Sequence, residues 1–97
     1  MKREITLAQA LTVLLTNNVP GQNIFYTISF DEVDRCIKFG KGYDPIYRET
    51  AWIISSMGSI VSFRNDNVDG FLTALFDDSY VGFHAGKKMF HVWEEVL

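Results

Sequence analysis

The stretch Ile24-Phe25-Tyr26-Thr27-Ile28-Ser29-Phe30 alternates between two kinds of side chain. Large apolar residues occupy its even-numbered positions, and the odd-numbered positions hold Phe25 and two hydroxyl side chains. Successive residues of a strand point to opposite faces of a sheet, so this pattern predicts a strand with one buried face. We therefore place a strand at residues 24–30 and build the rest of the fold around it.

The next segment, residues 31–39, is compatible with two structures. Ser29 and Glu32 have the spacing of a capping box, which favours a short helix that ends at Gly40. A hairpin is the alternative, because the segment is rich in residues that favour strands. We prefer the helix, and the composition of residues 40–45 predicts a loop after it.

Two other segments predict helices more clearly. Thr6 and Gln9 form a capping-box pattern before leucines at helical spacing, and Asn17 can close that helix. A second helix is expected after Asp66 or Asn67, because apolar side chains then recur with the period of an amphipathic helix. Those side chains are Val68, Phe71, Leu72, Leu75 and Phe76.

Two hairpins complete the prediction. Residues 50–55 and 60–64 read as one pair of strands, and residues 80–84 and 89–93 as another. Strands in hairpins, with helices between them and no repeated strand-helix-strand rhythm, indicate an α+β fold. We expect residues 1–97 to form a small single domain, in which a mostly antiparallel sheet of hairpins packs with two to three short helices.

Composition narrows the class of protein. Hydrophobic residues make up 47% and charged residues 22%, which is the balance of an ordinary globular protein. The net charge of −3 and the scattered basic residues argue against direct nucleic-acid binding. No apolar run approaches the roughly twenty residues that span a bilayer, so no membrane partner is expected. Cys36 is the only cysteine, which favours a reducing compartment and a cytoplasmic location.

The residue types of a catalytic or metal site are present, but their pattern is not. Cys36, His84 and His91 could supply a thiol nucleophile and its base, yet nothing around Cys36 matches a known nucleophile motif. The two histidines, seven residues apart, do not have the spacing of a helical metal site. We therefore predict no catalytic residues, no metal and no cofactor, and keep a small Cys/His enzyme as a second alternative.

The preferred function is that of a non-enzymatic interaction protein, such as an inhibitor, adaptor or regulator that binds a larger protein. The chain is small, mildly acidic and 14% aromatic, and an interface of about 800 Å² per partner fits a domain of this size. Inhibitors of host defence from phages or mobile elements share these general properties. The candidate interface residues are Tyr43, Tyr47, Trp52, Asp77, Asp78, Tyr80 and Trp93.

Two further possibilities concern ligands and self-association. A small-ligand or nucleotide-binding protein is the first alternative, with a pocket formed near Tyr43, Tyr47 and Trp52 or between subunits. A homodimer is a separate expectation, because a thin core rich in aromatic residues gains stability when its apolar surface is covered.

Overall fold

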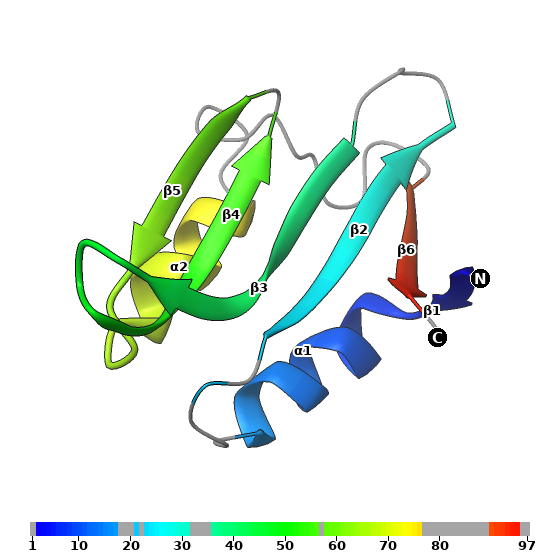
Figure 1. Ribbon diagram of the computed structural model, residues 1–97. Helices are drawn as coiled ribbons and strands as arrows, with labels where there is room; N and C mark the ends of the chain where they lie inside the picture. The colour runs from blue at the N-terminus through cyan, green and yellow to red at the C-terminus, as the bar shows by residue number, and fades with distance from the viewer. Residues whose placement is uncertain are drawn as a thin grey trace.

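The computed structural model describes residues 2–17, 21, 23–31, 36–56, 58–76 and 90–95. Within these residues the chain forms a six-stranded antiparallel sheet and two helices, which confirms the predicted α+β class (Figure 1). The strand order is β1-β6-β2-β3-β4-β5. The elements are β1 Lys2–Ile5, α1 Leu7–Thr16, β2 Ile24–Phe30, β3 Cys36–Asp44, β4 Glu49–Ser56, β5 Ser59–Phe63, α2 Val68–Phe76 and β6 Phe90–Glu95.

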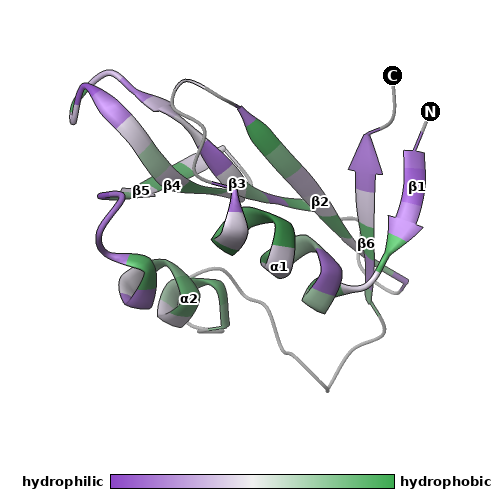
Figure 2. Cartoon of the chain, turned by 90° about the horizontal axis from the view of Figure 1, so that it is seen from below, coloured by the Kyte–Doolittle hydropathy of each residue, from purple (hydrophilic) through white to green (hydrophobic). Residues whose placement is uncertain are grey.

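Both helices lie on the same side of the sheet (Figure 2). α1 contacts β6, and α2 contacts β4 and β5. We call the opposite side of the sheet the open face, because no described helix covers it. Neither α1 nor α2, the two helices of the described chain, is long and apolar enough to cross a membrane.

The core lies between the sheet and the helices. Tyr26, Ile28 and Phe30 of β2 are buried, as their alternation in the sequence predicts. Ile28 pairs with Ile37 of β3 on one side and with Val92 of β6 on the other, so three apolar side chains form a row across the sheet. From the helices this core receives Ala10, Leu14, Phe71, Ala74 and Leu75.

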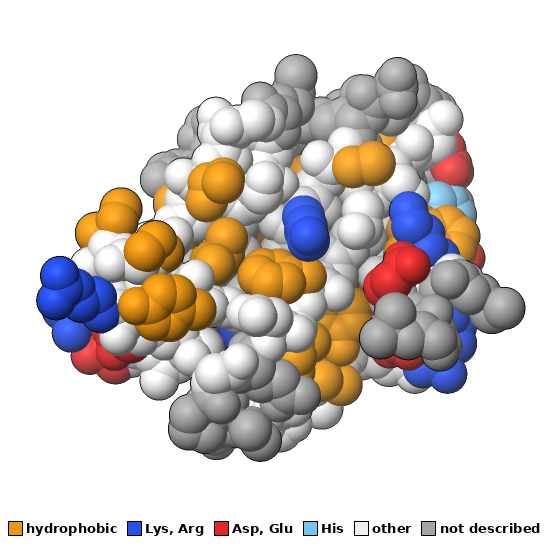
Figure 3. Space-filling view, viewed as in Figure 1, with side chains coloured by type: hydrophobic (Ala, Val, Ile, Leu, Met, Phe, Trp, Pro, Cys, Tyr) orange, Lys and Arg blue, Asp and Glu red, His pale blue; other side chains and the backbone are white. Residues whose placement is uncertain are grey.

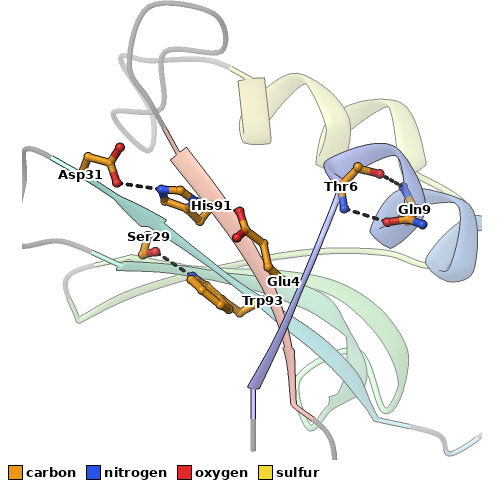
Figure 4. A network of polar contacts seen from close by, with 7 residues as sticks. All are labelled: Glu4, Thr6, Gln9, Ser29, Asp31, His91 and Trp93. Carbon is orange, nitrogen blue, oxygen red and sulfur yellow. Dashed lines mark hydrogen bonds and ion pairs between the residues drawn. The ribbon is translucent and has the colours of Figure 1, made fainter.

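The predicted helix ends are confirmed. Gln9 donates its backbone N–H to Thr6 Oγ1 at 3.0 Å, and the Gln9 side chain accepts the Thr6 backbone N–H at 2.8 Å (Figure 4). This reciprocal pair satisfies two of the backbone donors that a helix N-terminus leaves without partners. At α2 it is Asn67 that acts as the cap, accepting the N–H of Gly70 at 3.1 Å.

The predictions for residues 31–45 were wrong in two respects. The favoured helix is absent from the described part of this segment: Cys36–Asp44 is strand β3, paired antiparallel to both β2 and β4. The expected loop after Gly40 is also strand, as far as Asp44. Ile37 and Phe39 explain the outcome, because a strand places both on the buried face, where each is 0% exposed.

The two ends of the chain pair in a way that the sequence did not indicate. β1 lies beside β6, and β6 also pairs with β2, so β6 is an interior strand (Figure 1). β1 was not predicted. The predicted partner of β6, residues 80–84, lies outside the described residues, so that hairpin stays a prediction.

Candidate functional site

The end of β3 and the turn that follows it expose three large side chains, where turns usually carry polar residues. Ile46 is 86% exposed, Tyr43 59% and Tyr47 40%. Scattered apolar residues on a surface are common, but a group of them within five consecutive residues indicates an interaction surface. We call Tyr43, Ile46 and Tyr47 the turn surface.

Asp44 fixes the shape of this turn. Its Oδ1 accepts the backbone N–H of Ile46 at 2.8 Å and that of Tyr47 at 3.2 Å. The carbonyl of Asp44 also accepts the N–H of Arg48, at 2.7 Å. Asp44 itself is only 6% exposed. A single buried carboxylate therefore holds the backbone on which the exposed side chains stand.

The charge state of Asp44 follows from the same contacts. A hydrogen bond from the Ser62 side chain, together with those from the backbone of Tyr47 and Ile46, lowers the pKa of the Asp44 carboxyl below its ordinary value. Burial acts in the opposite direction and does not outweigh these bonds. Asp44 is thus ionised at neutral pH, and the charged form accepts these hydrogen bonds most strongly.

Cationic side chains border the turn surface. The guanidinium of Arg64 lies 5.9 Å from the centre of the Tyr47 ring, and its Nε is 3.5 Å from the carboxylate of Glu49. Arg48 follows in the turn with a φ of 57°, in the left-handed region that non-glycine residues rarely adopt. Figure 3 shows Lys or Arg side chains beside hydrophobic ones at this end of the molecule, where Figure 1 places the turn.

Comparisons with known proteins return no relative for this chain. No protein-family model, no curated protein and no solved structure matches it. A function for the chain therefore rests on its own residues.

The structure distributes the predicted interface residues among different environments. Tyr43, near the end of β3, and Tyr47, in the turn, are both exposed, and Trp93 lies on β6 with its side chain on the open face. Trp52 is 3% exposed, donates its indole N–H to the Asn65 carbonyl at 3.1 Å and packs on Phe71. Its side chain is thus part of the core. Asp77, Asp78 and Tyr80 lie outside the described residues.

Ile46 is the residue of the turn surface that sequence reasoning missed. The signal was present, because an aspartate followed by a proline favours a turn, and a large apolar residue inside a turn is unusual. The loop predicted from the sequence, residues 40–45, ends before Ile46, so Ile46 was not selected as a turn residue. With β3 ending at Asp44, Ile46 falls at the tip of a tight connection instead of within a long loop.

Cys36 and His91 lie in one row of the open face, on either side of Ser29. Ser29 pairs with Cys36 of β3 and with His91 of β6. Two strand spacings separate the cysteine and the histidine, which places their Cα atoms about 10 Å apart. Among the described residues, no hydrogen bond joins the thiol to the imidazole. His84 lies outside those residues.

Both ring nitrogens of His91 are occupied by carboxylates. Nδ1 is 2.6 Å from Glu4 and Nε2 is 2.7 Å from Asp31 (Figure 4). These two bonds raise the pKa of His91 above its ordinary value. The ring thus ties β1 and the end of β2 to β6 instead of acting as a base toward Cys36. The carboxylates bind separate nitrogens, and the described residues contain no group of three ligands suited to a metal ion.

Proposed function

We propose that this chain is a non-enzymatic protein that binds a larger protein partner through the turn surface. The observation that carries the proposal is Ile46, an isoleucine 86% exposed on a turn that Asp44 holds in a fixed shape. Exposing such a side chain in the free protein forgoes a favourable burial of about 1.5–3 kcal/mol. Burial of this side chain in an apolar pocket of a partner would recover that free energy.

The neighbours of Ile46 support the same proposal. Tyrosine and arginine are enriched among the residues that dominate binding energy at protein interfaces, and here they flank a central aliphatic side chain. Because Asp44 already orders the turn, little conformational entropy is lost when the partner binds. The cationic border of Arg48 and Arg64 favours a partner whose pocket has an acidic rim.

The test is a pull-down from an extract of the native host. It compares the host proteins retained by the wild-type chain with those retained by two variants. Ile46→Asp places a charge at the centre of the turn surface, and Ile60→Asp places one at another highly exposed isoleucine, on β5. We expect one protein to be retained by the wild type and by Ile60→Asp, and to be lost with Ile46→Asp. If all three retain the same proteins in the same amounts, the proposal is wrong.

A further inference from the structure

The outer strand β1 is held on the sheet by polar contacts more than by apolar burial. Its first three residues are exposed, and Ile5, the last, is partly buried against the core. In the sheet that the described residues form, β1 pairs with β6 alone. Two ion pairs between side chains of these residues also join the two strands, Arg3–Glu94 and Glu4–His91. A change in either pair therefore acts directly on the attachment of β1.

The His91 ring needs a proton on each nitrogen to make the contacts that the structure shows. Nδ1 is 2.6 Å from Glu4 Oε2, and Nε2 is 2.7 Å from Asp31 Oδ1 (Figure 4). An ionised carboxylate only accepts hydrogen bonds, whereas a neutral imidazole donates through one nitrogen and presents a lone pair at the other. Two ionised carboxylates on opposite sides of the ring are therefore satisfied together only by the imidazolium.

Loss of a proton from the ring should break the contact with Glu4. One carboxylate then faces a lone pair at hydrogen-bonding distance, and one of the two side chains must move away. Asp31 directly follows β2, an interior strand that pairs with both β3 and β6. Glu4 lies on β1, which has a single neighbouring strand. The strand with fewer restraints moves more readily, so β1 is the element that loosens.

We propose that His91 is a pH-dependent latch that holds β1 on β6 and releases it when the imidazole becomes neutral. The hydrogen bonds with Glu4 and with Asp31 raise the pKa of His91 above its ordinary value. The latch is thus fully closed below that ordinary value and opens as the pH rises through the folded one. Release of β1 exposes the backbone groups along one side of β6, an edge at which a strand of another chain can pair.

The other groups around His91 do not replace either carboxylate. Lys2 and Glu95 are opposite each other farther along β1 and β6, toward the other end of the open face. Trp93, whose ring centre is 6.0 Å from that of His91, carries no charge. Cys36 of β3 lies in the same row of the sheet as His91, with β2 between them. The helix α1 contacts β6 from the opposite face and contains no charged residue.

Amide hydrogen exchange of the full chain at about pH 6 and about pH 9 tests the proposal. All chains carry Cys36→Ser and His84→Gln, so that no thiol titrates and His91 is the single imidazole. Each rate is divided by that of an unstructured chain at the same pH, which removes the direct effect of hydroxide. We expect the protection of the β1 amides to fall about two- to fivefold at the higher pH, the range of an exposed ion pair.

Two results of this measurement would overturn the proposal. The first is unchanged protection of β1 between the two pH values. The second is protection of the β1 amides as strong as that of Ile54, which lies on the interior strand β4. In that case β1 would open only when the whole chain unfolds, and no separate release would exist.

Three substitutions separate the latch from a general loss of stability. Asp31→Asn should keep β1 protected at both pH values, because the new amide can donate to the unprotonated Nε2 and leaves the Nδ1–H for Glu4. Glu4→Gln should lower the protection already at the lower pH. Arg3→Gln, which removes the other ion pair, is the control and should lower protection equally at both pH values. A wild-type loss of protection in Asp31→Asn would overturn the proposal.

Discussion

Phe25 and Gly40 lie directly opposite each other on β2 and β3, and the phenyl ring covers the glycine on the open face. A Cβ at position 40 would also come within 2.0 Å of the Ile24 carbonyl oxygen, which belongs to the backbone and cannot rotate away. The glycine is therefore required by the close approach of two strands, whereas its place in the sequence suggested an ordinary turn glycine.

Gly40→Ala should destabilise the protein by about 1–3 kcal/mol or more, because the added methyl group forces β2 and β3 apart. Urea denaturation followed by circular dichroism measures the change. Gly58→Ala is the matched control: its surroundings are open, and only its φ of +85° opposes the substitution. We expect Gly58→Ala to cost less. Equal losses would show that the Phe25–Gly40 contact does not constrain the sheet.

Removing the Asp44 carboxylate should disorder the turn surface. Asp44→Ala loses the hydrogen bonds to Ile46 and Tyr47, whereas Asp44→Asn keeps a side-chain oxygen that can accept them. We expect faster amide exchange at residues 46 and 47 in the alanine variant and a smaller effect in the asparagine variant. Identical exchange in both variants and the wild type would contradict the role given to Asp44.

The Asp44 carboxyl should also make stability fall in acid. Its pKa is lower in the folded protein, so its contribution is complete above the pKa of the unfolded chain and is lost as the pH falls through the folded value. Thermal melting between neutral pH and about pH 3 measures this loss. Asp44→Asn should show a weaker dependence on pH over that range, and the same dependence would contradict the assignment.

The His91 imidazole should make the stability of the protein depend on pH in the opposite direction to Asp44. Its pKa is raised by Glu4 and Asp31, so the stability it supplies is complete below its ordinary pKa and is lost as the pH rises through the folded value. Proton NMR of the His84→Gln variant, in which one imidazole titrates, should show this raised pKa. Glu4→Gln with Asp31→Asn should return it toward the ordinary value. A titration unaffected by both substitutions would contradict the contacts in Figure 4.

The two edges of the sheet differ in their capacity for self-association. β1 carries three charged residues in sequence, and charges discourage strand pairing; β5 has none, and its Ile60 is 70% exposed. If the predicted homodimer forms, we expect it to pair β5 with β5. Sedimentation velocity should then show a dimer for the wild type and a monomer for Ile60→Lys. A dimer that survives the substitution would place the interface elsewhere.

Local patterns predicted local structure. The alternation of residues 24–30 and the Thr6–Gln9 capping box depend only on neighbours in sequence, and both were correct. Residues 36–39 suit both a helix and a strand, and their pairing in β3 with β2 and β4 decided between the two. The pairing of β1 with β6 joins the two ends of the chain, which no local pattern can indicate.

The same difference between information from sequence neighbours and information from distant strands applies to the candidate sites. Tyr43 and Tyr47 were chosen as interface candidates because they are aromatic, and both side chains are exposed. Trp52 was chosen as an interface candidate for the same reason, although its side chain is buried. Its actual position depends on register: it pairs with Lys41, and both side chains face the helices, where Lys41 Nζ lies 4.7 Å from the Trp52 ring. Register is a property of the whole sheet, so composition could not reveal it.

The most direct test of the proposed function is photo-crosslinking inside the native host. A photoreactive phenylalanine analogue at position 47 retains the aromatic side chain of the turn surface, and the same analogue at position 60 samples another exposed site. We expect one dominant crosslinked host protein from position 47, abolished when Ile46→Asp is added, and no crosslink to that host protein from position 60. No crosslink at position 47, or the same products from both positions, would contradict it.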